Sequence, residues 1–321
     1  MNRFAIALIA IVATVGAAFG ADQWPSRPIT IIVPYAPGGG PDVTARLFAE
    51  ALSPRLGQPV VVENHSGAGG LVGVDYAAAA KPDGYTLFLG TIDTQAILGH
   101  LHPGNKPDPT TAFAPISLLG RVNDLIVAAS PHLGITSFAQ LLAAGHAGRA
   151  FTFASPGVGT SFHILGELIG LHENIRLTLV PYRTSSAGYA DVMAGRVDLL
   201  ISGLPPILSL LKTGKLVPLV TTGAERTKDL PDTPTMTELG LKELALTNWF
   251  GLLAPVGTPQ SVITLLSQTI AEIDKDDAYR KRMEADRLEP VHSTPQEFGA
   301  FIQSEYTRFG DVIERAHIVV N

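Results

Sequence analysis

Pro34-Tyr-Ala-Pro-Gly-Gly-Gly-Pro-Asp-Val-Thr-Ala-Arg46 is the stretch that decides the fold of this chain. It follows the strand-forming run Ile29–Val33 and leads into apolar residues at helical spacing, so it predicts a buried strand, a glycine loop and a helix. Three consecutive glycines allow a positive φ and a close approach of a ligand to the backbone. The free N–H groups of the first helical turn, with the helix dipole, favour an anion.

The glycine loop does not match the known phosphate-binding patterns. A P-loop needs Gly-Lys-Ser or Gly-Lys-Thr after the glycines, whereas Gly40 is followed by Pro41 and Asp42. The pattern G-x-G-x-x-G also fails, because Val43 stands where its last glycine belongs. A turn that uses glycine for backbone geometry alone therefore remains open as an alternative.

Strand-like and helix-like runs alternate along the chain, which predicts an α/β fold with parallel strands joined by right-handed crossovers. The 321 residues exceed what one hydrophobic core usually serves, so we expect two domains. Strands are expected at 29–33, 60–63, 86–89, 113–129, 151–155, 177–180, 197–201, 216–221 and 246–254. Helices are expected at 43–56, 70–80, 133–144, 161–171, 188–194, 206–211, 260–273 and 295–316.

Two crossings between the domains follow from this order. The run 113–129 carries the chain into the second domain, and 246–254 is a return strand. We expect residues 21–121 plus 248–321 to form domain 1 and 122–247 to form domain 2. Two crossing strands then act as a hinge between two lobes, the two-domain form of a solute-binding protein that closes on small solutes.

Residues 1–20 are predicted to be a secretory signal peptide. Arg3 supplies the positive charge, Phe4–Val15 the apolar segment, and Ala18-x-Gly20 a cleavage site. An uncleaved anchor over 4–21 is the alternative, but no basic flank follows, so we expect a periplasmic protein cleaved near Gly20. The absence of cysteine excludes a lipoprotein anchor, disulfides and cysteine-ligated metals.

Composition and charge limit the kinds of partner that this chain can bind. The chain is 46% hydrophobic with a formal charge of −6, which becomes −7 without Arg3 (22 basic against 29 acidic residues). An acidic chain without a basic run argues against nucleic acid. His100, His102 and Asp108 lie in a stretch expected to be a loop, and we interpret them as solvated residues and not as metal ligands. We expect no metal, no cofactor and a monomer.

A second group of candidate binding residues lies at 154–163. Glycines at Gly157 and Gly159 again follow a strand, and the hydroxyls of Thr160 and Ser161 open a helix that also carries His163. Such hydroxyls commonly cap their own helix, which is the alternative to ligand binding. Two opposed sets of N–H and O–H groups would suit a carboxylate.

Two further loops add charged candidates. Tyr182 and Arg183 precede another helix, and a guanidinium pairs well with a carboxylate, although a surface ion pair would use Arg183 equally well. Asp93 and Gln95 come just after the strand at 86–89, where parallel sheets expose ligand-facing loops.

The amino-acid sequence of the chain resembles that of the tripartite tricarboxylate transporter solute receptors, also called Bug receptors. The resemblance begins with Trp24–Gly73 and covers nearly all of the mature chain in the family's order. It continues through Pro82-Asp-Gly-Tyr-Thr86, Pro181-Tyr-Arg183, Gly195-Arg-Val-Asp198, Leu230-Pro-Asp-Thr-Pro-Thr235 and Gly251-Leu-Leu-Ala-Pro255. It implies an exported receptor that captures a small organic carboxylate for an integral-membrane transporter.

The resemblance also implies which residues bind the solute. The matching loops are Tyr35, Ala36, Pro37, Gly38 and Gly39, whose family counterparts engage a carboxylate partly through ordered water, and Gly159, Thr160, Ser161 and His163. The chain departs from the family's pattern at four positions. Pro41 replaces a small hydroxyl residue, Thr184 a glycine, and Ser202 an acid that often follows the Val-Asp stretch, while Asp93 adds an acid where a neutral residue is common.

Catalysis and signalling are the alternative functions. Gly-x-Ser-x-Gly and His-Glu-x-x-His are both absent, and no cysteine nucleophile exists. Ser155 with a distant His163 lacks the turn that exposes a catalytic serine, so an exported hydrolase is disfavoured and we expect no enzyme. A ligand sensor that feeds a membrane signalling protein would have the same fold and stays open.

Overall fold

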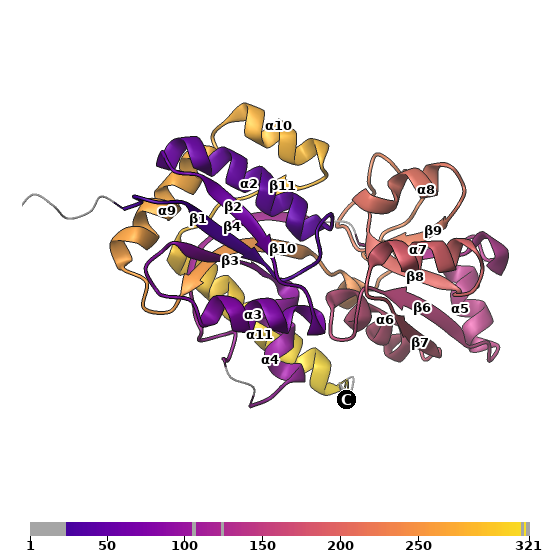
Figure 1. Ribbon diagram of the computed structural model, residues 1–321. Helices are drawn as coiled ribbons and strands as arrows, with labels where there is room; N and C mark the ends of the chain where they lie inside the picture. Colours follow the sequence, from indigo (N-terminus) through magenta and orange to yellow (C-terminus); the bar gives the residue numbers. More distant parts are fainter. Residues whose placement is uncertain (1–23, 105–106, 123–124, 316–317, 319–321) are drawn as a thin grey trace, which may run out of the picture.

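The structure, a computed structural model, describes residues 24–104, 107–122, 125–315 and 318. The predicted signal peptide at 1–20 lies outside this part of the chain. Two lobes stand side by side, each built on one β-sheet with helices on both faces (Figure 1).

The first lobe is built on a six-stranded sheet in the order β11-β4-β10-β3-β1-β2. Its parallel part comprises β1 (Ile29–Val33), β2 (Val60–Asn64) and β3 (Thr86–Thr91). β10 (Asn248–Pro255) runs antiparallel between β3 and β4 (Phe113–Val122), and β11 (Glu289–Pro290) pairs with β4 at the edge. The sheet is thus mixed, since the return strand enters it from the second lobe.

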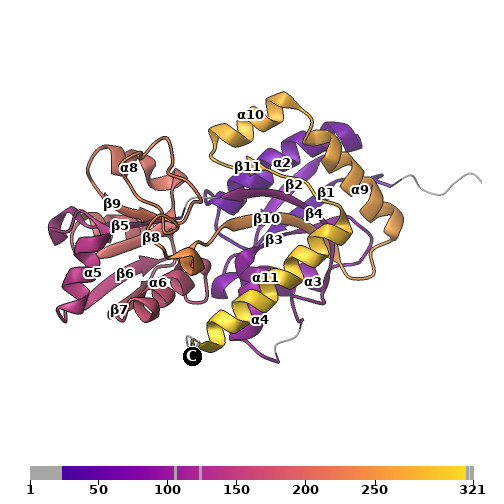
Figure 2. The same ribbon diagram turned by 180° about the vertical axis from the view of Figure 1, so that it is seen from behind.

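Helices cover both faces of this sheet. Alternate residues of β1 point to opposite faces, as expected for a strand. Ile29, Ile31 and Val33 pack with α2 (Gly40–Leu56), α9 (Gln260–Ile273) and α10 (Asp277–Ala285). Ile32 joins the core under α3 (Leu71–Ala78), α4 (Leu98–Leu101) and the long α11 (Pro295–Arg315), which crosses the back of the lobe (Figure 2).

The second lobe is built on a five-stranded sheet in the order β7-β6-β8-β5-β9. β6 (Phe151–Ser155) runs parallel to β7 (Leu177–Pro181) and β8 (Leu199–Gly203), whereas β5 (Leu125–Ala129) is antiparallel to β8 and β9 (Val217–Thr221). The helices of this lobe are α5 (Phe138–His146), α6 (Ser161–His172), α7 (Ser185–Met193) and α8 (Leu208–Lys212).

The chain changes sheet twice. It leaves the first sheet after Val122 and enters the second at Leu125, and it returns between Thr221 and Asn248. The division into 21–121 plus 248–321 and 122–247 stays a proposal. α11 packs against β4, as expected for a C-terminal helix that covers the first lobe.

The structure corrects several predicted elements. The run 113–129 forms two strands, one in each sheet, and the second sheet is mixed. The first helix of the second lobe begins at Phe138 and not at 133, because the Ser137 hydroxyl caps it by accepting from Gln140 N at 3.3 Å. Asp93–Ile97 form a π-helical turn where a loop was expected, and His100 lies in α4. α10 was missed, since its charged sequence has few apolar residues to mark a helix.

Candidate functional site

The glycine loop between β1 and α2 is held by a carboxylate of the chain itself. Asp42 is 4% exposed, and its Oδ2 accepts from Gly38 N at 2.9 Å while its Oδ1 accepts from Asn64 Nδ2 at 2.9 Å. Arg46 pairs with the same carboxylate from the next helical turn. Gly38 has φ +84, a conformation that glycine adopts without strain. One N–H of the predicted anion site is therefore already occupied by Asp42.

The pKa of Asp42 reflects two opposing effects. Burial alone would raise it, but the hydrogen bonds from Arg46, Gly38 N and Asn64 outweigh burial and hold the pKa below its ordinary value. A carboxylate with a lowered pKa stabilises the fold above its unfolded-state pKa, and this contribution is lost as the pH falls through the lowered value. Asp42 therefore fastens the loop at neutral pH.

Asp93 joins the two lobes. Its Oδ1 accepts from Ser161 N, at the start of α6, at 2.7 Å, and its Oδ2 accepts from Tyr35 Oη, in the glycine loop, at 3.0 Å. Tyr35 Oη also lies 3.0 Å from Thr91 Oγ1. The structure thus brings together three of the residues that the sequence singled out, Tyr35, Asp93 and Ser161, although 68 residues separate the last two.

The loop before α6 is ordered by its own side chains. Thr160 Oγ1 donates to Gly157 O at 2.9 Å and lies 3.0 Å from Ser155 Oγ. His163 Nδ1 accepts from Gly159 N at 3.1 Å, and its Nε2 lies 3.4 Å from Glu167 Oε1. His163 and Thr160 therefore hold the loop in place, which is the capping role that the sequence left open.

The loop before α6 lies close to two segments of the opposite lobe, α4 and the turn before α3. A Cβ placed on Gly159, where φ is +81, would lie 2.9 Å from Leu101 Cδ1 in α4. A Cβ on Gly69, in the turn before α3, would lie 3.1 Å from Val158 O. Glycine at 159 thus permits both the backbone conformation and the approach of the lobes.

Burial raises the pKa of Asp93 above its ordinary value, and the hydrogen bonds from Ser161 and Tyr35 oppose this only in part. The ionised form is thus disfavoured in the folded protein, so the penalty is present above the raised pKa and is relieved as the pH falls through it. An asparagine at 93 keeps Oδ1 for Ser161 N, and Tyr35 can then donate to Thr91 and accept from the amide.

We expect Asp93→Asn to fold and to be at least as stable as the parent at pH 7.5. The stability advantage of Asp93→Asn over the parent should shrink between pH 7.5 and pH 4.5. The reason is that protonation of Asp93 removes the destabilisation that its buried charge causes in the parent. Urea unfolding of both proteins at the two pH values measures this. A variant less stable than the parent at pH 7.5, with no change in the difference at pH 4.5, would contradict it.

The third predicted loop is engaged within its own lobe. Tyr182 Oη donates to Asp191 Oδ2 at 2.6 Å, and burial together with this carboxylate raises the pKa of Tyr182 to about 12. Arg183 is exposed. Ser202 is buried, and its hydroxyl lies 3.1 Å from Tyr189 Oη, a residue that the sequence did not single out. The binding roles of Tyr182, Arg183 and Ser202 stay predictions.

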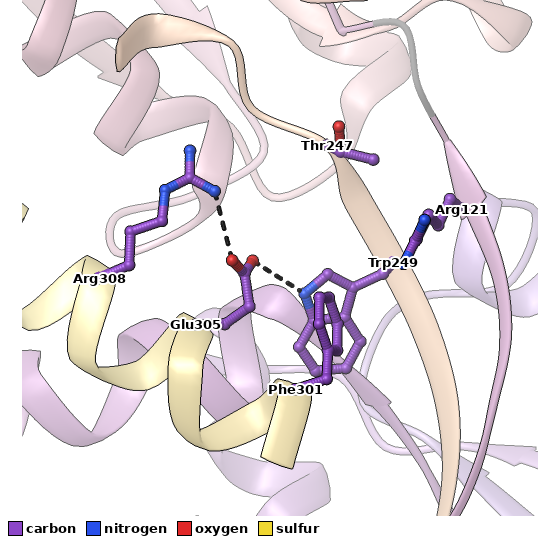
Figure 3. A pocket seen from close by; sticks show the side chains of 6 residues that line it. All are labelled: Arg121, Thr247, Trp249, Phe301, Glu305 and Arg308. Atoms are coloured by element: carbon purple, nitrogen blue, oxygen red, sulfur yellow. Dashed lines mark hydrogen bonds and ion pairs between the residues drawn. The ribbon is translucent and has the colours of Figure 1, made fainter. Parts of the chain in front are cut away.

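A separate pocket of about 230 Å³ lies where the return crossing enters β10 (Figure 3). Glu305 of α11 accepts from Trp249 Nε1 at 3.3 Å and pairs with Arg308 at 3.3 Å. The pocket contains none of the predicted site residues. It is lined by Arg121, Thr247, Trp249, Phe301, Glu305 and Arg308.

A second polar contact joins the lobes at another point. Arg287, after α10, forms an ion pair with Asp229, which also pairs with Lys212 at 2.7 Å. Asp229 belongs to the other lobe, since it pairs with Lys212 of α8 and the adjacent Leu230 packs in the core of that lobe. The lobes are thus connected by ionisable side chains at Asp93 and at Asp229, in addition to the two crossings.

The described residues give no support for a metal site. No group of three or more His, Cys, Asp or Glu side chains in this part of the chain is placed to hold a metal ion. His100 Nε2 instead lies 2.8 Å from Tyr306 O. None of the described helices is both long and apolar enough to span a bilayer.

Comparison with known proteins identifies the family of this chain. The pattern of the tripartite tricarboxylate transporter family receptor matches residues 44–318. Protein BugT of Bordetella pertussis is 35% identical, over 98% of this chain and 97% of that protein. An R. palustris protein solved with adipate has a TM-score of 0.85 and 32% identity, with 92% of this chain and 99% of that chain covered.

A second solved structure is the protein MatC of Rhodopseudomonas palustris with bound malate. It shares 27% identity at a TM-score of 0.82, and the match covers 90% of this chain and all of that one. The two-lobed fold is thus shared with these solved proteins. The chain belongs to the tripartite tricarboxylate transporter receptor family of periplasmic solute-binding proteins.

Proposed function

We propose that this chain captures a small organic carboxylate between its two lobes and presents it to an integral-membrane transporter. The observation that carries the location of the site is that Asp93 brings together the loop before α2 and the start of α6, which belong to opposite lobes, through Tyr35 Oη and Ser161 N. Relatives solved with adipate and with malate support a carboxylate ligand. The family's description supports a transporter as the partner.

The proposed site consists of the two loops and their neighbours. The backbone N–H groups of Gly39, the N-cap of α2, and Gly40 have no partner within that helix, whereas Ser161 N, at the start of α6, donates to Asp93. The residues proposed to bind the solute are Tyr35, Ala36, Pro37, Gly38, Gly39, Asp93, Gly157, Gly159, Thr160, Ser161, His163, Tyr182, Arg183 and Ser202.

Binding without chemistry needs only a few hydrogen bonds to the solute. Four charge-assisted hydrogen bonds contribute roughly 1.5–3 kcal/mol each. After the cost of ordering the partners, this reaches the free energy of about −8 kcal/mol that corresponds to a micromolar site. We therefore propose that the solute leaves the receptor unchanged. We propose further that the receptor is a monomer and that it is exported with cleavage near Gly20.

We expect a bound carboxylate to stabilise the mature protein by about 2.7 kcal/mol at a concentration of one hundred times its Kd. A thermal-shift screen of mono-, di- and tricarboxylates, amino acids and aromatic acids identifies the ligand. Denaturation with and without that ligand then measures the stabilisation. Recovery of chemically altered ligand after long incubation would contradict the proposal, as would a screen in which no organic acid stabilises the protein.

A further inference from the structure

Among the described residues, the buried carboxylate of Asp93 has no cationic partner. It is 6% exposed, and among the residues that the structure describes it forms no ion pair with lysine, arginine or histidine. A carboxylate has about four lone-pair sites, and Asp93 uses one on Ser161 N and one on Tyr35 Oη. About half of its accepting capacity is thus unused.

A second buried group beside Asp93 is also unsatisfied. Ser161 Oγ is fully buried and makes no hydrogen bond of good geometry to any described residue, although it lies beside Asp93, whose carboxylate its own backbone N–H binds. Buried polar side chains in proteins are nearly always hydrogen-bonded. A spare hydroxyl and a carboxylate lacking a counter-charge therefore lie together where the lobes meet.

These groups favour a cation over an anion. The positive end of the α6 dipole is already matched by Asp93, so a second carboxylate at this point would meet a like charge in a poorly solvated place. An ammonium group carries three donors and one positive charge. It would use the open lone pairs of Asp93 and could donate to Ser161 Oγ as well.

We propose that Asp93 determines specificity by pairing with a cationic nitrogen of the solute, so that the receptor prefers carboxylates that also carry an amine. The inference rests on the proposed carboxylate-binding function and names the class of solute. The Asp93–Ser161 bond crosses between the lobes, so separating them breaks it and uncovers the carboxylate. An amine that enters the open receptor is then enclosed beside Asp93 on closure.

Matched pairs of acids test this. Succinate and aspartate differ by one ammonium group, as do glutarate and glutamate, and calorimetric titration of the full mature chain at pH 7.5 gives the affinity for each. We expect the parent to prefer the amine-bearing member of at least one pair by tenfold or more. Asp93→Asn should reduce that preference to within about twofold.

Asp75→Asn is the matched control. Asp75 is exposed on α3 in the same lobe, so this variant removes the same charge without touching the place where the lobes meet. It should keep the preference of the parent. A parent that binds the plain diacid as well as its amine-bearing counterpart overturns the inference, and so does an Asp93→Asn variant that weakens both members of a pair equally.

The outcomes separate this inference from the proposed function. Tight binding of plain diacids by the parent leaves the function standing and removes the role of Asp93. Binding of a simple alkylamine without any acid supports the role of Asp93 and contradicts the carboxylate receptor. If Asp93→Asn fails to fold, the preference of the parent decides, with Asp93→Ser as the second variant.

Discussion

Gly159→Val should lower the affinity for the best carboxylate at least a hundredfold while the protein stays folded. Gly159 has φ +81, and a Cβ there already lies 2.9 Å from Leu101 Cδ1 of the opposite lobe. Valine adds two more methyl groups for which Leu101 would have to make room. Two lost charge-assisted contacts, each equivalent to about tenfold in affinity, account for the expected size of the effect.

The control for backbone strain is Gly214→Val. Gly214 lies in the same lobe with φ +70 and is exposed. A Cβ placed on it would have no described neighbour within 4 Å. In both variants a β-branched residue at positive φ lowers the stability of the fold by about 1–2 kcal/mol or more. Only Gly159→Val also obstructs the other lobe. Calorimetric titration and far-UV circular dichroism of both variants measure the difference. An affinity of Gly159→Val within a factor of two of the parent would remove this loop from the site.

Asp42→Asn should lower the free energy of unfolding by about 2–3 kcal/mol and weaken ligand binding at least tenfold. Every group around the carboxylate is a donor, namely Gly38 N, Asn64 Nδ2 and Arg46. An amide at 42 would therefore place its NH₂ against one of them and leave a buried donor unsatisfied. Asn64 cannot turn its amide over without loss, because its Nδ2 also donates to Tyr35 O at 3.0 Å.

Asp75→Asn again serves as the control, since an exposed substitution usually changes stability by no more than about 0.5 kcal/mol. Urea unfolding of parent and variants measures the effect. Because the pKa of Asp42 is lowered, the difference between parent and Asp42→Asn should stay constant from pH 8 to pH 5 and shrink only in stronger acid. A difference that already disappears at pH 5 would show that Asp42 does not hold the loop.

Elements with a clear local pattern could be predicted from the sequence alone. Ile29–Val33, Phe151–Ser155 and Gln260–Ile273 have the bounds that their apolar spacing indicates. The motifs in the sequence also indicate the family and the two-lobed fold. This works because burial on one face repeats with the period of a strand or a helix, and glycine marks backbone turns regardless of what lies nearby.

Other features depend on where the lobes and layers come to lie. Asp42 satisfies a loop that looked like a free anion site, and Asp93 reaches Ser161 across the two lobes. A polar side chain at a given spacing does not reveal its partner, because hydrogen bonds form over a few ångströms between residues far apart in sequence. The sequence by itself therefore determined the family, the strand–glycine–helix units and the candidate residues. Only the tertiary structure decided which donors the chain already uses, and that no cationic side chain of the described residues pairs with the buried Asp93.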